Sequence, residues 1–345
     1  MEVNLISDTV TKPTPQMLEA MFAAPVGDDV FKEDPSVNAL EEAVAQLFGK
    51  QAALFFPSGT MTNQTAIKIH TQPGDQVICD HFSHIYHYEG GGASFNSGVS
   101  CRLIQGDRGR ITATQIEEAI NPPDFYHSPK SSLVSLENTT NKGGGAVYDI
   151  EEIKKIKMLC EAHNLALHLD GARLWNALEV TQESPKAYGA LFDTLSLCFS
   201  KGLGCPVGSV LVGSNEAIEN ALKIRKILGG GMRQAGYLAA AASYALTHHR
   251  KDLKNDHQKA KEIAAVLQTL PLVDHIEPVQ TNIVIFALKP QQDETKFILQ
   301  MKEKGIYFIG LGKGKLRMVT HRDYTEAQHD YLLTTLTKLN EDERL

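Results

Sequence analysis

A lysine follows an apolar run near the middle of the chain. The segment Thr194–Phe199 predicts a buried strand, Lys201 comes two residues later, and the glycines of Gly202–Gly204 predict a turn. Apolar surroundings disfavour the ammonium form of a lysine and so free its amine to act as a nucleophile. Such an amine can form a Schiff base with a carbonyl group. The alternative is a lysine whose side chain extends from the strand end into water.

An aspartate and an arginine follow a second predicted strand. The segment Leu165–Leu169 is largely apolar, and Asp170 and Arg173 come directly after it. The carboxyl ends of parallel strands are the place where α/β sheets bind ligands. A capping role at the start of the next helix is the alternative for Asp170.

A third segment predicts an anion site. Ser58, Gly59 and Thr60 lie between the predicted strand Ala52–Phe56 and a helix that we expect to open near Met61. Backbone N–H groups at such a helix start favour a bound anion, and the helix dipole adds to the attraction. A plain turn between strand and helix is the alternative.

Together, these three segments predict a site for pyridoxal phosphate. This cofactor needs a lysine for its Schiff base, a carboxylate beside its pyridine nitrogen and a pocket for its phosphate. Lys201, Asp170 and the turn at Gly59 supply these groups, and we expect their strand ends to meet at one edge of a sheet. A carboxylate in that place keeps the ring nitrogen protonated, and the protonated ring accepts the electrons of a carbanion.

The histidines could suggest a metal instead. His81, His84 and His87 recur every three residues, but such positions drift around a helix and no acidic or cysteine ligand accompanies them. We therefore expect no metal site. We expect His84 to stack on the cofactor or to act as a base, and to be neutral when stacked on a cationic ring. His127 precedes a predicted strand, Ser132–Leu136, and a surface-loop position is its alternative.

Strands alternate with amphipathic helices over the first 250 residues. This alternation predicts an α/β fold with a mostly parallel seven-stranded sheet and helices on both faces. The remaining predicted strands are Gln76–Cys79, Cys101–Ile104 and Ser209–Val212. One long helical pattern, Met232–Leu270, leads into a smaller α+β region. The predicted domains are therefore 1–250, an amino-terminal arm with the large cofactor-binding domain, and 251–345, a small carboxyl-terminal domain.

The composition is ordinary for a soluble protein, with 42% hydrophobic and 22% charged residues. A net charge of −7 without a basic cluster argues against a nucleic-acid partner. The chain start has no signal-peptide pattern and no apolar run approaches ~20 residues, so we expect neither export nor a membrane partner. The five cysteines are odd in number and scattered, which favours a reduced, cytoplasmic protein.

Motifs over nearly the whole chain resemble those of the threonine aldolases. That family belongs to the fold type I, or aspartate aminotransferase-like, pyridoxal phosphate enzymes, and the motifs occur here in the family's order. The matching segments are Ser7–Thr11, Val26–Val30, Glu33–Asn38, Pro57–Thr60, Ser83–Ile85, Ser135–Thr139, His168–Arg173, Ser200–Gly204, Arg225–Lys226, Gly229–Gln234 and Arg317–His321.

The resemblance implies roles around the cofactor. Lys201 would hold it as a Schiff base, Asp170 would pair with the pyridine nitrogen, and His84 would stack on the ring. The phosphate would be bound by Ser58, Gly59 and Thr60, with Arg233 contributed by a neighbouring subunit.

The resemblance also implies roles around an amino-acid substrate. Ser7, Arg173 and Arg317 would grip the substrate carboxylate, with Arg173 also close to the cofactor. Lys226 would approach the site across a subunit interface. His127 falls where the family carries a second active-site histidine. The protein would accordingly be a homo-oligomer with shared active sites, and a dimer of dimers is expected.

The activity implied by the resemblance is that of an aldehyde-lyase. Such an enzyme cleaves L-threonine, L-allo-threonine and other β-hydroxy-α-amino acids to glycine and an aldehyde, by retro-aldol cleavage of the Cα–Cβ bond. Two alternatives stay open. One is another enzyme of the same fold type, namely a β-eliminating lyase, a racemase or an aminotransferase. The other is an α/β binding protein without catalytic activity.

Three positions depart from the family pattern. Phe31 and Lys32 stand where Tyr-Gly is frequent, and Thr140 stands where a histidine is common. Loss of the tyrosine hydroxyl and of a flexible glycine could alter substrate preference or a contact with a neighbouring subunit. None of the three belongs to the residues expected to hold the cofactor.

Overall fold

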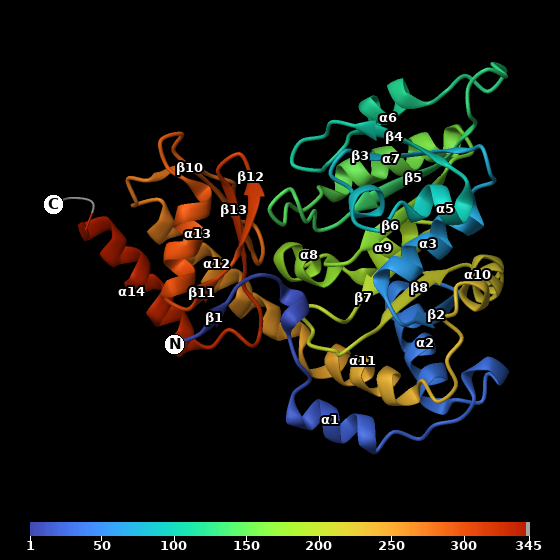
Figure 1. Cartoon of the computed structure of the whole chain (residues 1–345). Coiled ribbons are helices and arrows are strands. Elements are labelled where there is room, and N and C mark those ends of the chain that lie inside the picture. The colour runs from blue at the N-terminus through green and yellow to red at the C-terminus, as the bar shows by residue number, and fades with distance from the viewer. Residues whose placement is uncertain (343–345) are drawn as a thin grey trace.

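The computed structural model describes residues 1–342 and contains a central sheet of seven strands (Figure 1). The order across the sheet is β2-β8-β7-β6-β5-β3-β4. The bounds are β2 Ala52–Phe56, β3 Gln76–Asp80, β4 Ser100–Ile104, β5 Ser131–Glu137, β6 Ala166–Gly171, β7 Thr194–Cys198 and β8 Ser209–Gly213. The predicted seven-stranded, mostly parallel sheet is confirmed.

Only β8 runs against its neighbours within this sheet. It pairs antiparallel with both β7 and β2, while the pairings among β7, β6, β5, β3 and β4 are all parallel. Residues 199–208 alone separate β7 from β8. Because a parallel return needs a crossover of a dozen or more residues, this short connection brings β8 back as a hairpin and leaves Lys201 in the turn.

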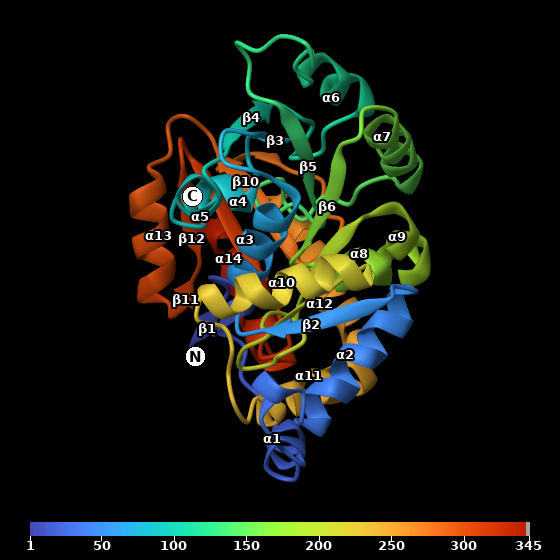
Figure 2. The same cartoon turned by 90° about the vertical axis from the view of Figure 1, so that its right-hand side faces the viewer.

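Helices cover both faces of the sheet (Figures 1 and 2). The face with the larger apolar cluster is covered by α2 (Pro35–Phe48), α6 (Ala113–Ala119), α7 (Ile150–Ala162), α8 (Leu174–Thr181), α9 (Pro185–Leu191) and α11 (Gly236–His248). The opposite face is covered by α3 (Gly59–His70), α4 (His84–His87), α5 (Gly92–Ser97) and α10 (Asn215–Ile227). The predicted helices on both faces are confirmed, although α3 begins two residues before the expected Met61.

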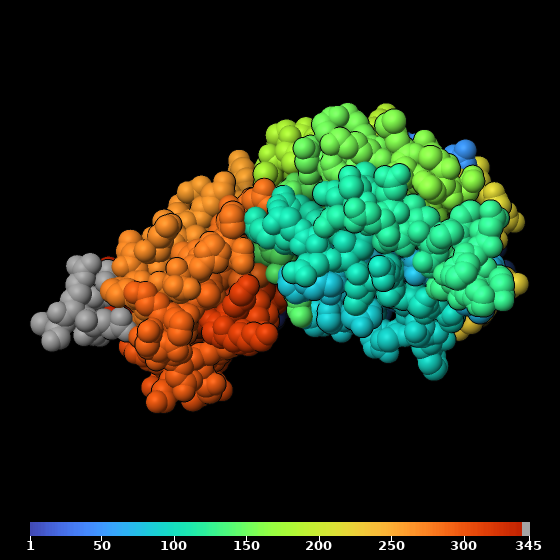
Figure 3. Space-filling model, turned by 90° about the horizontal axis from the view of Figure 1, so that it is seen from above, coloured from blue at the N-terminus to red at the C-terminus, as the bar shows by residue number. Residues whose placement is uncertain are grey.

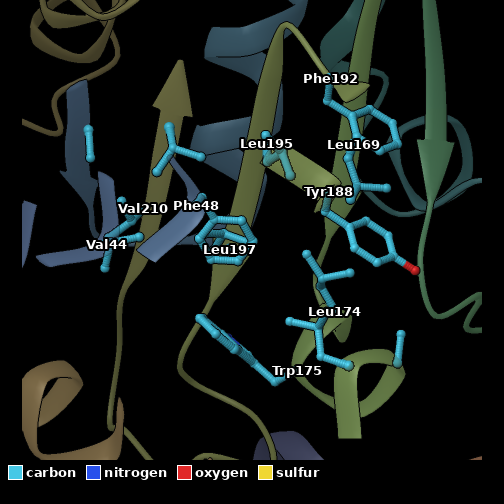
Figure 4. Packing of buried hydrophobic residues seen from close by; sticks show 14 of the residues in the cluster. Val44, Phe48, Leu169, Leu174, Trp175, Tyr188, Phe192, Leu195, Leu197 and Val210 are labelled. Atoms are coloured by element: carbon cyan, nitrogen blue, oxygen red, sulfur yellow. The ribbon is translucent and has the colours of Figure 1, made fainter. Parts of the chain in front are cut away.

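The two faces of β6 and β7 differ in chemistry because side chains alternate along a strand. Leu169, Leu195 and Leu197 point into the larger cluster, where they pack near Phe48 and Trp175 (Figure 4). Truncating a buried aromatic residue of this kind typically costs about 3–5 kcal/mol. The alternate positions are polar and buried, and face α3. They are His168, Asp170, Thr194 and Ser196.

The carboxyl-terminal part forms a second, antiparallel sheet of order β12-β13-β10-β9. Its strands are β9 Val273–Ile276, β10 Ile283–Leu288, β12 Ile309–Gly312 and β13 Lys315–Val319, and its helices are α12 Leu253–Leu267, α13 Glu294–Glu303 and α14 Glu326–Asp342. Figure 3 shows this part, in orange and red, beside the large sheet region. A smaller α+β unit was expected here, but β9 was not.

The single long helix expected over Met232–Leu270 is wrong. Helix α11 ends at His248, a short turn spans Arg250–Asp252, and α12 then begins. The ring of His249 is hydrogen-bonded to the Leu203 carbonyl oxygen at 2.7 Å, so the bend is tied to the loop that follows Lys201. The predicted domain boundary at residue 250 falls in this turn and stays a prediction.

The amino-terminal arm joins both parts of the molecule. Its first strand, β1 (Val3–Asn4), pairs in parallel with β11 (Ile306–Tyr307), and Val3 is buried in the carboxyl-terminal core. The arm then crosses to the large sheet and continues into α1 (Pro15–Phe22). Within residues 1–342, no helix has the length and apolar character needed to cross a membrane. The five cysteines are all free thiols.

Candidate active site

A cavity of about 250 Å³ lies at the carboxyl ends of β5, β6 and β7. The arm, α3, the segment around α4 and strand β13 complete its wall. Eight of the residues expected at the site line it, namely Ser7, Gly59, Thr60, His84, Asp170, Arg173, Lys201 and Arg317. They come from positions as far apart as 7 and 317, so the fold brings together segments singled out by local patterns and segments singled out by the resemblance.

Lys201 reaches the cavity from the turn after β7. Its Nζ lies 3.5 Å from the Sγ of Cys198, and its backbone carbonyl accepts a hydrogen bond of 2.8 Å from the Thr11 hydroxyl. That bond ties the turn to the amino-terminal arm. Among the described residues Lys201 has no ion-pair partner, so its amine faces the cavity without a fixed counter-ion.

Asp170 is buried at the end of β6, with only 3% of its surface exposed. Its Oδ2 accepts a 2.8 Å hydrogen bond from the Asn63 amide, and its Oδ1 accepts one of 3.1 Å from the Ala172 N–H. These two donors fix the orientation of the Asp170 carboxyl group in the cavity wall.

The first turn of α3 faces the cavity through Gly59 and Thr60. The N–H groups of a first helical turn have no acceptor within the helix and are available to an anion. Ser58 is the N-cap residue, and its hydroxyl accepts a 3.2 Å hydrogen bond from the Met61 N–H. Ser58 therefore shapes the anion site by fixing the helix start, and its hydroxyl is already engaged.

His84 stands between two carboxylates that the sequence reasoning did not single out. The backbone N–H of His84 donates to Glu137 Oε2 at 2.8 Å, and its ring Nδ1 lies 2.9 Å from Glu89 Oε1. Burial opposes the charged ring, but the hydrogen bond to Glu89 and the charges of Asp170, Glu89 and Glu137 outweigh it and raise the pKa of His84. This differs from the expected neutral ring, because that argument considered a cationic cofactor and not the surrounding acids.

The Glu137 carboxyl has an unusually high pKa. Burial, reinforced by the nearby charge of Asp170, raises its pKa to about 7. Its Oε1 accepts a 2.7 Å hydrogen bond from the Asn141 N–H. Glu137 is the last residue of β5 and is paired in register with Asp170 of β6, so the strand-end criterion that selected Asp170 could have selected it too. Glu89 follows α4 and carries no comparable signal.

Arg173 and Arg317 bring two cations to one side of the cavity. Arg173 donates from Nε and Nη2 to the two oxygens of Asp8, at 2.8 and 2.7 Å. Arg317 donates from Nη1 to Asn141 Oδ1 at 2.8 Å and from Nη2 to the Ile6 carbonyl at 3.1 Å. Its buried Nε has no partner among the described residues. Burial and the charge of Arg173 lower the pKa of Arg317 to about 10, which still leaves it protonated at neutral pH.

Apart from the N-cap residue Ser58, three expected site residues do not line the cavity of their own chain. His127 is exposed in the loop before β5, where it stacks on Tyr126. Because β5 ends at Glu137 in the cavity wall, its start lies roughly 20 Å away along the strand. Arg233 pairs with Asp28 at 2.8 Å on the surface, and the exposed Lys226 lies close to the same loop.

A compact group of potential metal ligands does exist, although not at the spacing considered above. His84, Glu89 and Asp170 place ligand atoms within 4.8 Å of one another. The Asn63 Nδ2 donates to Asp170 at 2.8 Å and to Glu89 at 2.9 Å, so amide hydrogens already join the two acids.

Residues 4–290 match the model of the beta-eliminating lyase family. The chain belongs to that family. The low specificity L-threonine aldolase of Escherichia coli K12 is 43% identical over 327 residues, which cover 94% of this chain and 96% of that protein. The low-specificity L-threonine aldolase 1 of Arabidopsis thaliana is 39% identical over 340 residues, covering 96% and 94%. The solved threonine aldolase of Leishmania major superposes with a TM-score of 0.85 at 22% identity, covering 98% of this chain and 99% of that one. The expected fold type is thereby confirmed.

Two of the three departures from the resembled pattern, Phe31 and Lys32, lie at the surface beside Arg233. The guanidinium of Arg233 lies 6.0 Å from the ring centre of Phe31. Lys32 adopts a left-handed backbone conformation with φ +61°, which suits the glycine usual there. Its ammonium pairs with Glu41 at 3.1 Å. The third departure, Thr140, is buried, and its hydroxyl donates to the Arg108 carbonyl at 2.8 Å.

Proposed function

We propose that the protein is a pyridoxal-phosphate-dependent aldehyde-lyase. Its substrates are L-threonine, L-allo-threonine and other β-hydroxy-α-amino acids, and its products are glycine and an aldehyde. The observation that carries the proposal is the meeting of Lys201, Asp170 and the first turn of α3 around one cavity that also holds two arginines. Relatives of about 40% identity that carry the threonine aldolase name favour this reaction within the family.

The donor set fits the cofactor. The Lys201 amine would bind its aldehyde carbon, Asp170 would hold its ring nitrogen, and the N–H groups of Gly59 and Thr60 would bind its phosphate. When bound, the cofactor supplies an electron sink for the pair released as the Cα–Cβ bond breaks.

The two arginines suit the substrate carboxylate. The unpartnered Nε of Arg317 and the free N–H groups of Arg173 leave donors for an anion, and a carboxylate between them would relieve the repulsion of the two cations. Anchoring the carboxylate also orients the bonds at Cα and so selects which bond breaks.

His84 is the candidate base for the β-hydroxyl proton. Its Nδ1 is engaged by Glu89, which leaves Nε2 as the atom that can take a proton from the substrate, directly or through water. Glu89 would orient the ring in the way that a carboxylate orients a catalytic histidine elsewhere. A general base of this kind contributes about 10²–10⁴-fold to the rate.

The residues that lie outside the cavity of their own chain are the reason to propose an oligomer. Arg233, Lys226 and His127 are exposed in their own chain, so a role at the active site requires a second subunit that presents them. We infer a homo-oligomer with shared sites, most simply a dimer of dimers. His127 would then touch the hydroxyl side of the substrate, and His127→Ala should change the preference between the threonine diastereomers.

One assay tests the proposal against the alternatives that share the cofactor. The purified protein, supplied with pyridoxal phosphate, is incubated with L-threonine and L-allo-threonine, and glycine, acetaldehyde, keto acid and epimer are quantified. Glycine and acetaldehyde in equal amounts support the aldehyde-lyase. A keto acid alone indicates elimination or transamination, an epimer alone indicates a racemase, and a protein without visible absorbance or turnover is a binding protein.

A further inference from the structure

A series of hydrogen-bonded polar side chains runs from Asp170, near the carboxyl end of β6, toward the amino-terminal ends of β6 and β7. Asn63 Oδ1 lies 3.3 Å from His168 Nε2, and His168 Nδ1 lies 2.9 Å from the Thr194 hydroxyl oxygen. The same hydroxyl lies 2.9 Å from Nε2 of His70. Asn63, His168 and Thr194 are buried, with at most 2% exposure. His70 borders an open hollow of about 680 Å³ at these amino-terminal ends.

Secondary structure alone aligns these four residues. His168 and Thr194 are paired in register on β6 and β7, at the polar positions that alternate with leucines. Asn63 and His70 are seven residues apart on α3, which places them on the same face of the helix about 10 Å apart. The helix packs on both strands, so the polar face of the strands meets the polar face of the helix.

The contacts with the two acids show where the hydrogens lie. Asn63 Nδ2 is within 2.9 Å of both Asp170 Oδ2 and Glu89 Oε1, and two carboxylates can only accept. The Asn63 carbonyl oxygen must therefore face His168. Because that oxygen is also an acceptor, His168 must carry a hydrogen on Nε2.

The hydrogen positions at Thr194 and His70 follow from the charge of His168. His168 is fully buried and its ring nitrogens contact only Thr194 and Asn63; because a buried charge without a counter-ion is costly, the ring is neutral and its Nδ1 is an acceptor. The Thr194 hydroxyl then donates to Nδ1, and its oxygen is free to accept from the Nε2–H of His70. Every hydrogen in the chain points toward Asp170 and Glu89, an arrangement in which each bond strengthens the next.

We propose that the Thr194 hydroxyl, oriented by His70, fixes the tautomer of His168 and thereby keeps the Asn63 amide donating to both Asp170 and Glu89. Thr194, His168 and Asn63 are then positioning residues. They act through Asp170, the partner of the cofactor nitrogen, and through Glu89, which orients His84. The catalytic consequence rests on the function proposed above, whereas the hydrogen arrangement does not.

Loss of the Thr194 hydroxyl has a defined structural outcome. The Thr194 backbone carbonyl lies 3.2 Å from His168 Nδ1 and offers an acceptor for the other tautomer. With its hydrogen on Nδ1, His168 would present a bare Nε2 to the Asn63 carbonyl oxygen. Two acceptors repel, so the Asn63 amide would have to turn and withdraw its hydrogens from the carboxylates.

The test compares Thr194→Val, which removes the hydroxyl at nearly constant shape, with Thr194→Ser, which keeps it. The first readout is ¹⁵N NMR of histidine-labelled protein without cofactor, with the His168 signal assigned by its loss in His168→Gln. Wild type and Thr194→Ser should show the Nε2–H tautomer, and Thr194→Val the Nδ1–H tautomer. Thr194→Ala serves as the second hydroxyl-free variant if Thr194→Val fails to fold by circular dichroism.

The second readout uses the loaded enzyme. In Thr194→Val the pH at which the cofactor absorbance changes should move by on the order of one pH unit, and kcat should fall about tenfold while KM changes less than threefold. Thr194→Ser should match wild type. His70→Gln, whose amide can donate in place of Nε2, should lower kcat and shift the absorbance change less than His70→Leu does.

Two results overturn the inference. One is an unchanged Nε2–H tautomer of His168 in the hydroxyl-free variants, and the other is a cofactor absorbance and kcat that respond equally to Thr194→Val and Thr194→Ser. If the tautomer changes as expected but wild-type protein neither binds pyridoxal phosphate nor cleaves threonine, the proposed function fails and the hydrogen arrangement stands.

Discussion

The guanidinium of Arg173 and the carboxylate of Asp8 form a buried two-point ion pair, with N–O distances of 2.8 and 2.7 Å. Asn282 donates a further hydrogen bond to Asp8 at 3.2 Å. The pair joins the amino-terminal arm, the end of β6 and the carboxyl-terminal sheet beside the cavity. The ion pair therefore couples the position of the arm to that of Arg173, the arginine proposed to bind the substrate carboxylate.

Asp8→Asn should destabilise the protein by about 3–5 kcal/mol at neutral pH, because it leaves a buried guanidinium without its counter-ion. Burial opposes ionisation of Asp8, but Arg173 outweighs it and lowers the pKa from 3.8 to about 2. The stability from ionised Asp8 is thus fully present above pH 3.8 and is lost as the pH falls toward 2. Urea unfolding of wild type and Asp8→Asn should show a difference in the free energy of unfolding that is constant from pH 7 to 5 and becomes smaller below pH 4. A constant difference down to pH 3 would contradict the ion pair.

Lys201→Ala should abolish the visible absorbance that the wild-type protein acquires with pyridoxal phosphate. Borohydride reduction of loaded wild-type protein, followed by peptide mapping, should place the label on Lys201. Lys296→Ala is the matched control, because that lysine is exposed on α13, away from the cavity, and the label should stay on Lys201. A label on any other lysine would refute the assignment.

The rate should rise with pH through the pKa of His84. The neighbouring acids raise that pKa above 6.5, and a base works only when deprotonated, so kcat/KM should increase across an apparent pKa above this value. His84→Phe, which keeps a flat ring, should lower kcat at least about 10²-fold and flatten the acid limb of the profile. Glu89→Gln should shift this limb to lower pH, since it removes a charge that favours the imidazolium. A profile identical to wild type in His84→Phe would exclude His84 as the base.

Shared active sites predict complementation between inactive variants. Lys201→Ala and Arg233→Ala each damage every site of their own homo-oligomer. In a mixed two-fold pair, one site carries both changes and the other carries neither, so random mixing should restore roughly one quarter of wild-type activity. The proteins are mixed in mild denaturant, dialysed and assayed, with each variant treated alone as control. Activity no higher than the average of the two variants would show that each site is built from one chain.

Two substitutions of Lys32 can separate the energetic cost of its left-handed backbone from the contribution of its ion pair with Glu41. Burial raises the pKa of Glu41, and Lys32 opposes that rise, so Lys32→Met should destabilise the protein by about 1–3 kcal/mol by leaving Glu41 without its cation. Lys32→Gly loses the same ion pair but relieves the left-handed strain, and should be more stable than Lys32→Met by about 1 kcal/mol. Urea unfolding at pH 7 measures both. Equal stability of the two variants would show that the +61° φ costs nothing here.

Short-range patterns were sufficient to predict much of the fold and the meeting of Lys201, Asp170 and Gly59 around one cavity. Buried strands followed by Lys201 or Asp170, and a strand followed by a glycine at a helix start, are local signals because strand alternation and helix capping act within a few residues. The parallel sheet then brings such strand ends to one edge. The resemblance added Ser7 and Arg317, whose own segments carry no such signal.

Tertiary structure alone determined the partners of those residues. The pairing of Arg173 with Asp8, the placement of Glu89 and Glu137 around His84 and the polar chain behind Asp170 all join segments far apart in the sequence. The distance of His127 from its own cavity is likewise a consequence of strand direction, which no local pattern encodes. Local propensities act through neighbouring residues, whereas burial, charge and hydrogen bonding in the site depend on which distant segments the packed sheet brings into contact.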